Sequence, residues 1–234
     1  MDAKRGFVPE DERNFSADSL IILKKASRHI TWLLNEGYDI KQACTFVGNH
    51  FLLSERQRLA AARSTAAEIQ LEKRREKRLD MQDLNGKTVW IDGFNVIITL
   101  EVMLSRSVLL ECMDGAIRDL AALRGTYRII PETREAVRMM IDILKSAGVE
   151  EIHILLDEPV SNSGRLKALI ADAGEAYPFG LDIRVQKNVD RELYDKDCVI
   201  SSDSLVLDHC RSWFSLAGEC LKNVGAPVIR VWGE

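Results

Sequence analysis

The stretch VWIDGFNVIITL, residues 89–100, places a carboxylate and a carboxamide inside the most apolar run of the chain. Its first residues favour a buried strand, and Ile97 and Ile98 continue the apolar character beyond the interruption. Burying an ionised carboxylate is costly unless a hydrogen-bonded turn, a cation or a metal ion compensates it. We therefore expect Asp92 to end a buried strand at a point where its charge is compensated.

The composition is that of an ordinary globular protein. The chain has 234 residues, of which 46% are hydrophobic and 29% charged, enough for one large domain or two small ones. The N-terminus is too charged for a secretory leader, and no apolar run approaches the ~20 residues of a membrane span, so we expect a cytoplasmic protein with no membrane partner. The five scattered cysteines and four histidines lack the spacing of a disulfide framework or zinc site.

Residues 1–85 predict a small all-α domain. An apolar stripe with helical period predicts a helix that stops near Gly37, and Asp39 is the expected N-cap of a second helix over about 39–49. The sequence SERQ at 54–57 has the form of a capping box and opens a third helix. This helix is expected to continue, too polar to be packed, through LEKRREKRL at 71–79. The turn QDLNGK at 82–87 marks the boundary with a second domain, 86–234.

The basic end of the third helix has two interpretations. It is either a solvated linker or an arm that contacts the phosphates of a nucleic acid, because clustered Lys and Arg neutralise such a backbone. The candidate contacts are Arg74, Arg75, Lys77 and Arg78.

Residues 86–234 alternate between strand and helix patterns. Short apolar runs occur at 88–92, 152–157, 182–186, 198–203 and 227–232, and helical patterns occur near 107–123, 132–147, 164–173 and 204–223. This alternation predicts an α/β fold with an open parallel sheet flanked by helices. In such folds, sites gather outside the carboxyl ends of the strands.

Three of these strands end in an aspartate: Asp92, Asp157 and Asp203. A single strand-end aspartate is usually a helix N-cap. If the three strands are neighbours, however, the carboxylates converge, and their repulsion favours a bound cation. Oxygen ligands suit Mg²⁺ or Mn²⁺, which can activate water and stabilise the charge of a phosphoryl transition state.

Two motifs resemble those of PIN-like nucleases of the NYN/YacP type: DGFNVI at 92–97 and SSDS at 201–204. The resemblance implies a PIN-like fold, Mg or Mn as cofactor and a nuclease activity, with Asp92 and Asp203 in the acidic cluster and Asn95 holding it. The stretches 46–63, 114–120 and 155–164 also resemble an archaeal and bacterial family of unknown function that joins a helical domain to a PIN-like domain.

This chain departs from the superfamily pattern in its other acids. Glu111, Asp114 and Asp119 compete for the acid on the helix expected near 107–123. Asp190, Asp195 or Asp197 would replace a later one, because the segment from Gln186 to Cys198 is too short for a full helix. If the acidic set is incomplete, the alternative is a protein that binds nucleic acid without cleaving it.

The loop PVSNSG at 159–164 directly follows Asp157. It offers Ser161, Asn162 and Ser163 either as phosphate ligands at a helix N-terminus or as the residues of a capped turn. Arg118 either pairs locally with Asp119 or faces a substrate phosphate.

The expected function is that of a metal-dependent ribonuclease or phosphodiesterase that acts on RNA. Asp92, Asp157 and Asp203 would bind the metal, and Asp114 or Asp119 would complete the catalytic set. The alternatives are a non-catalytic protein that binds nucleic acid or nucleotides, and an adaptor for protein partners. The sequence does not decide whether the protein forms a homo-oligomer.

Overall fold

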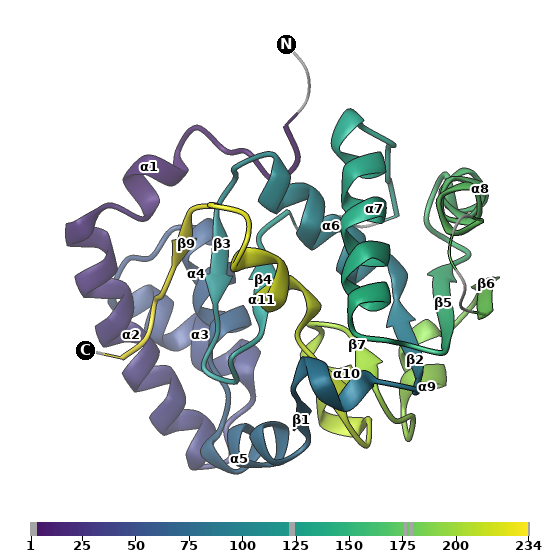
Figure 1. Cartoon of the computed structure of the whole chain (residues 1–234). Coiled ribbons are helices and arrows are strands. Elements are labelled where there is room, and N and C mark those ends of the chain that lie inside the picture. The colour runs from purple at the N-terminus through teal and green to yellow at the C-terminus, as the bar shows by residue number, and fades with distance from the viewer. Residues whose placement is uncertain (1–3, 122–124, 176, 178–179, 234) are drawn as a thin grey trace.

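The protein is a mixed α/β structure in which a helical region precedes a six-stranded parallel sheet flanked by helices (Figure 1). The computed structural model describes residues 4–121, 125–175, 177 and 180–233. The predicted fold class, an open parallel sheet behind an all-α region, is confirmed. None of the described helices is long and apolar enough to cross a membrane.

In the helical region, α3 and α4 begin where the capping residues predict. Asp39 caps α3 by accepting hydrogen bonds from the backbone of Lys41 and Gln42, and Ser54 and Gln57 form a reciprocal capping box at α4. The helices are α1 (Asp11–Asn14), α2 (Ala17–Asn35), α3 (Ile40–His50), α4 (Glu55–Ser64) and α5 (Glu68–Glu76).

The predicted continuous third helix is wrong. Thr65 and Ala67 are extended, so the chain breaks between α4 and α5. The reason is tertiary: the backbone carbonyl of Ser64 accepts from the backbone of Met113, and that of Arg63 accepts from the Arg118 side chain. These carbonyls at the end of α4 therefore find partners in a distant hairpin rather than in a continuing helix.

The six-stranded sheet has the order β1-β8-β7-β2-β5-β6. Its strands are β1 (Arg78–Leu79), β2 (Thr88–Asp92), β5 (Glu151–Asp157), β6 (Gly180–Gln186), β7 (Val199–Ile200) and β8 (Trp213–Phe214). The central strand β2 pairs in parallel with β5 on one side and with β7 on the other. The strand that ends at Asp92 therefore lies between the strands that precede Asp157 and Asp203, which is the arrangement that convergence of the three carboxylates requires.

The remaining elements of this region flank the sheet and lead into it. They are η1 (Met81–Leu84), α6 (Gly93–Leu104), α7 (Pro131–Ser146), α8 (Ser163–Gly174), α9 (Val189–Leu193), α10 (Ser204–His209) and α11 (Leu216–Leu221). Helix α6 follows β2 without a loop and is buried on nearly every side. Ile97 and Ile98 therefore belong to a core helix rather than to a strand. Such all-round hydrophobicity removes the periodic signal of a helix.

The helix predicted near 107–123 is also wrong. Strands β3 (Leu109–Glu111) and β4 (Ile117–Asp119) form an antiparallel hairpin, and β9 (Val228–Ile229) adds to β3 in parallel. Gly115 supplies the left-handed backbone of the turn, with φ +79°. In Figure 1 this small sheet lies between the helical region and the six-stranded sheet.

Two hydrophobic cores meet at the small sheet. One fills the space around the six-stranded sheet and α6. The other contains Leu23 and Ile30 of α2 together with Leu110, Leu120 and Val231 from beyond residue 86. The helical region therefore completes its core with residues of the α/β region.

Candidate functional site

Five aspartates line one cavity of about 240 Å³ at the carboxyl ends of the central strands. Asp92 ends β2 and Asp157 ends β5, whereas Asp203 lies three residues beyond β7. The other two are Asp119, at the end of β4, and Asp190, in the first turn of α9. Parallel strands of an open sheet place their ends at one edge, which is where ligand sites form in this class of fold.

Asp92 is buried and does not serve as a helix cap. It occupies the N-cap position of α6 but makes no side-chain capping bond; its Oδ2 accepts a hydrogen bond from Ser201 Oγ at 2.8 Å. Burial raises the pKa of Asp92 to about 8, against the lowering effect of Ser201, and the charges of Asp190, Asp203 and Asp157 raise it further. The carboxyl group thus lacks the compensation that a cap or a partner cation would give.

The residues after Asp92 explain the rest of the DGFN motif. A Cβ atom on Gly93 would lie 2.9 Å from the backbone oxygen of Leu155, so glycine is needed where α6 starts against β5. Asn95 Oδ1 accepts from the backbone N–H of Ser202 at 2.8 Å and from its hydroxyl at 2.9 Å. Asn95 therefore holds the segment 201–203 against the start of α6.

Asp157, Asp190 and Asp203 occupy three different environments. Burial raises the pKa of Asp157. Burial also raises the pKa of Asp190, and the charges of Asp203 and Asp157 raise it further. Asp203 Oδ1 caps α10 by accepting from the backbone of Leu205 at 2.8 Å and of Val206 at 3.4 Å. The common role of a strand-end aspartate thus holds for Asp203 and not for Asp92.

The helical region contributes a cation to the cavity. Arg63, in the last turn of α4, lines the cavity and places Nη2 3.7 Å from Asp119 Oδ2. Asp119 is itself fixed, because its carboxylate accepts from Ala121 N at 2.7 Å and Thr99 Oγ1 at 3.1 Å. Arg63 Nε is buried and has no hydrogen-bond partner within the described residues. Sequence reasoning missed Arg63, because nothing in a helical pattern shows that it faces a sheet beyond residue 86.

The cavity offers the ligand atoms that a hard divalent cation prefers, since the protein would bind such an ion through carboxylate oxygens. Within the described residues, however, no group of three or more His, Cys, Asp and Glu side chains is arranged to hold a metal ion. The predicted ligands Asp92, Asp157 and Asp203 therefore share a cavity without already converging on one point. Water or substrate oxygens would have to complete the ligand set of a bound ion.

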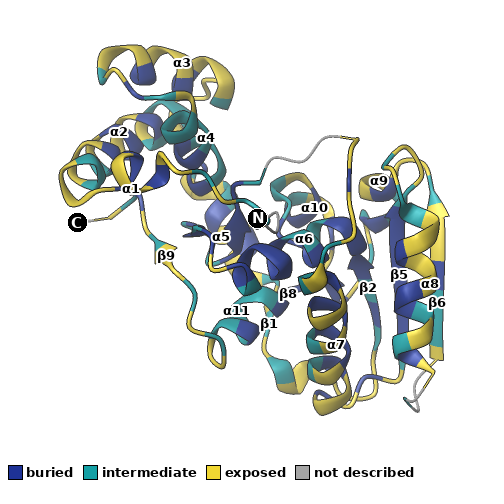
Figure 2. Cartoon of the chain, turned by 90° about the horizontal axis from the view of Figure 1, so that it is seen from above, coloured by how far each residue is buried: buried dark blue, intermediate teal, exposed yellow. Residues whose placement is uncertain are grey.

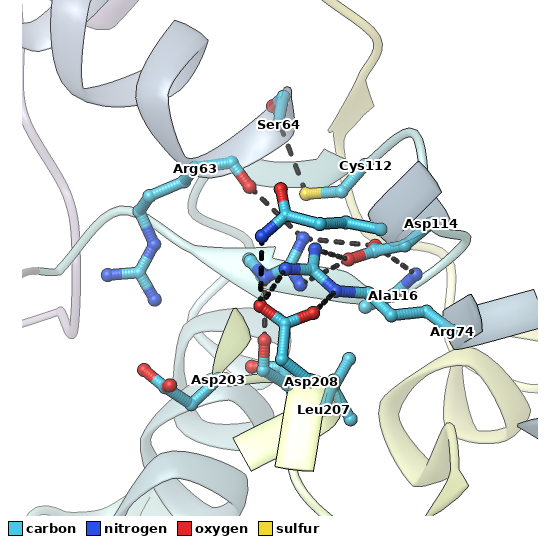
Figure 3. A network of polar contacts seen from close by, with 12 residues as sticks. Arg63, Ser64, Arg74, Cys112, Asp114, Ala116, Asp203, Leu207 and Asp208 are labelled. Atoms are coloured by element: carbon cyan, nitrogen blue, oxygen red, sulfur yellow. Dashed lines mark hydrogen bonds and ion pairs between the residues drawn. The ribbon is translucent and has the colours of Figure 1, made fainter. Parts of the chain in front are cut away.

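Asp114 and Arg118 are not in the cavity, which corrects their predicted roles. Asp114 accepts from Arg118 Nη2 at 2.6 Å and from Arg74 Nη1 at 2.8 Å, in a buried network (Figure 3). Burial opposes the ionisation of Asp114, but Arg118 and Arg74 lower its pKa below the ordinary value. Arg118 Nε also donates to the backbone oxygen of Ser202 at 2.6 Å. Arg118 is buried and fully engaged, so it does not face a substrate.

Most of the candidate phosphate contacts at the end of α5 are also structural. Arg74 is buried, and beyond its bond to Asp114 it forms two hydrogen bonds with Asp208 of α10, at 2.7 and 2.9 Å. Lys77 Nζ donates to two backbone oxygens near the end of α10. The Arg78 guanidinium lies 5.4 Å from the centre of the Trp213 ring, and Arg75 is exposed. The expectation that this segment is too polar to be packed is therefore wrong.

The loop after Asp157 is held by Tyr127. Ser161 Oγ accepts from the Tyr127 N–H and donates to its carbonyl, to which Asn162 Nδ2 also donates at 2.7 Å. Ser161 and Asn162 are thus engaged as turn residues rather than free for a phosphate. Ser163 begins α8.

Of the competing acids, Asp119 and Asp190 reach the cavity and the others do not. Glu111 pairs with Arg230, and Asp197 lies near Arg211 and Ser212. Asp195 has a left-handed backbone in the turn after α9. Asp119 at the end of β4 and Asp190 at the start of α9 line the cavity, whereas Glu111 of β3 and the two aspartates before β7 are not among its lining residues.

A further buried carboxylate, which contacts the cavity-lining Tyr127, was missed. Glu101 of α6 is fully buried; it pairs with Arg5 Nε at 2.7 Å and accepts from the Tyr127 hydroxyl at 2.5 Å. Tyr127 itself lines the cavity. The signal was available, because Glu101 interrupts an apolar run in the same way as Asp92 does.

Comparison with known proteins matches two families to the chain. Residues 81–219 match the family described as "Domain of unknown function (DUF5616)" and residues 22–77 match "Protein of unknown function (DUF434)". The chain is 36% identical over 187 residues, 79% of its length, to "Uncharacterized protein MJ0935" of Methanocaldococcus jannaschii, of which the match covers 88%. No solved structure shows a significant match.

Proposed function

Since the chain belongs to the DUF5616 family, whose description names no reaction, we propose a function on the geometry of the acidic cavity. The protein hydrolyses phosphodiester bonds in RNA with the help of Mg²⁺ or Mn²⁺. One observation carries this proposal: five aspartates line one cavity at the ends of adjacent parallel strands, and the most buried of the three strand-end acids, Asp92, is not used as a cap.

The acids that would hold the cation are Asp92, Asp157 and Asp203, with Asp190 as a fourth group that feels two of their charges. When bound, the ion supplies an activated water and neutralises charge on the phosphoryl group. The resemblance of DGFNVI and SSDS to motifs of PIN-like nucleases supports the same assignment of Asp92 and Asp203.

The other cavity residues have positioning and binding roles in this proposal. Asn95 keeps the segment 201–203 at the cavity by accepting two hydrogen bonds from Ser202. Arg63 binds a phosphate oxygen, because it lines the cavity and its guanidinium offers the planar N–H donors that suit a phosphate. Asp119 orients Arg63 for that contact.

The test is hydrolysis of single-stranded RNA and of bis(4-nitrophenyl) phosphate, a small phosphodiester, with and without Mn²⁺. We expect Mn²⁺-dependent hydrolysis that falls at least about a hundred-fold in Asp92→Asn and Asp157→Asn. Asp172→Asn, an exposed aspartate on α8 outside the cavity, is the matched control and keeps full activity. Mn²⁺ also raises the melting temperature of the protein and of the control, but not of Asp92→Asn.

A second candidate function is binding of nucleic acid without cleavage. It is favoured by two observations: no group of three or more His, Cys, Asp and Glu among the described residues is arranged to hold a metal ion, and the guanidinium of Arg63 lies beside Asp119. In that case Mn²⁺ changes neither the melting temperature nor the covalent state of the RNA. That result would overturn the hydrolytic proposal.

A further inference from the structure

A second candidate site lies on the helical region, between α2 and α3. A groove of about 480 Å³ is lined by Lys25, Arg28, His29, Trp32, Leu33, Phe46 and Val47. Two of its aromatic side chains are unusually open, Trp32 at 61% exposure and Phe46 at 73%. In Figure 2 the outward faces of α2 and α3 are largely exposed, at the margin of the molecule away from the six-stranded sheet.

The groove combines aromatic rings with positive charge. Lys25, Arg28 and Trp32 are spaced three and four residues apart, so they share one face of α2. No aspartate or glutamate lines the groove, and no ion pair among the described residues involves Lys25 or Arg28. Leu33 and Val47 form its less exposed floor. The charge of this surface is therefore available to an anionic partner.

We propose that the α2–α3 groove binds single-stranded nucleic acid. Bases stack on Trp32 and Phe46, and Lys25 and Arg28 contact the adjoining phosphates, which is the combination that single strands require. This inference rests on the proposed function in one respect: the groove would bind the RNA strand that the acidic cavity hydrolyses. It also places the phosphate contacts elsewhere than at the end of α5, where Arg74 and the following Lys77 are engaged within the protein.

The test is binding of a fluorescently labelled oligouridylate of about 12 nucleotides to the full chain in EDTA, so that no hydrolysis occurs. We expect Trp32→Ala and Phe46→Ala each to weaken binding by roughly ten-fold or more. Lys25→Gln and Arg28→Gln should each reduce the salt dependence, by about 0.7 in the slope of log K against log salt. Tyr38→Ala and Lys167→Gln are the controls, an exposed aromatic and an exposed cation outside the groove, and leave binding unchanged.

Fluorescence gives a second readout. Trp32 is exposed, whereas Trp213 is fully buried and Trp90 and Trp232 are partly buried outside the groove. The oligonucleotide should therefore quench the tryptophan emission of the protein but not that of Trp32→Phe, which keeps a ring for stacking and is expected to retain most of the affinity. Equal quenching of the two proteins would overturn the inference.

The outcomes separate this inference from the proposed function. If groove variants bind RNA as well as the wild type, the groove inference fails, whatever the hydrolysis of bis(4-nitrophenyl) phosphate shows. If that small diester is not hydrolysed but the groove variants lose affinity for RNA, the proposed function fails and the groove inference is upheld. A shift of Trp32→Ala from dimer to monomer in sedimentation, with RNA affinity unchanged, would assign the groove to a second copy of this chain and overturn the inference.

Discussion

Asp92 is a carboxylate held where its ionisation is disfavoured. It lies at the end of the central strand, accepts one hydrogen bond from Ser201 and faces the charges of Asp157, Asp190 and Asp203. Asp203, one strand away, is stabilised by two backbone N–H groups of α10. Asp92 and Asp203 both follow an apolar strand, but only the Asp203 carboxylate caps the helix that comes next. Its charge is therefore stabilised, whereas that of Asp92 is not.

The first prediction concerns Asp92→Asn in metal-free buffer. The pKa of Asp92 is about 8 in the folded protein against an ordinary value near 3.8, so the folded state retains its proton longer than the unfolded state. The stability that depends on this proton is complete below pH ~3.8 and is lost as the pH rises to about 8, by about 1.4 kcal/mol for each pKa unit. Asn cannot ionise, so the variant should gain stability over the wild type across this window.

The measurement is the difference in unfolding free energy between Asp92→Asn and the wild type from denaturant titrations at pH 4, 6 and 8. The difference should be near zero at pH 4 and should favour the variant at pH 8. A variant less stable than the wild type by several kcal/mol at pH 8 would show that ionised Asp92 has a structural partner.

At the scale of elements, α5 is joined to the β3–β4 hairpin and to α10 by buried charges. Arg74 bridges Asp114 of the hairpin turn and Asp208 of α10, and Arg118 connects the same turn to the carbonyl of Ser202 (Figure 3). Buried ion pairs add little net stability, but removing one partner leaves an uncompensated charge. The network therefore fixes α5 and the segment before Asp203 in one arrangement.

The second prediction compares Arg74→Gln with Arg75→Gln. The two arginines are neighbours on α5, but Arg74 is 2% exposed and Arg75 is exposed. Arg74→Gln leaves Asp114 and Asp208 without this partner and should cost about 3–5 kcal/mol of unfolding free energy. Arg75→Gln should change it by no more than about 0.5 kcal/mol. Equal effects in urea titrations would mean that the network does not hold α5.

At the scale of the whole molecule, the two regions share a core. Leu110, Cys112, Leu120 and Val231 pack with the apolar residues of α2, α3 and α4. Two charged contacts support the same junction: Arg56 of α4 pairs with Asp11 and donates to the carbonyl of Leu120, and Arg5 pairs with Glu101 of α6. The helical region thus has no complete core of its own.

The third prediction follows from that shared core. The chain should unfold in a single transition, with equal calorimetric and van't Hoff enthalpies, although its sequence predicts a domain boundary near residue 85. A fragment of residues 86–234 should lose this transition, because it exposes Leu110, Leu120 and Val231. Two separate transitions in the intact chain would contradict the prediction.

The sequence by itself determined the features that depend on neighbours along the chain. The capping residues Asp39 and Ser54 placed the starts of α3 and α4, and strand and helix alternation gave an open parallel sheet. The aspartates after apolar runs marked the edge where the cavity lies. These signals succeed because hydrogen-bond caps and strand-end turns are built within a few residues.

Tertiary structure decided which charged groups meet. Asp114 and Asp119 are five residues apart, yet the hairpin sends one to Arg74 and Arg118 and the other to the cavity. Arg63 reaches the same cavity from the helical region. Helix α6 could not be predicted, because it is buried on nearly all sides and its sequence therefore lacks a periodic apolar pattern. Such pairings join residues far apart in the chain, and their energies depend on burial and distance, which no local pattern of residue types encodes.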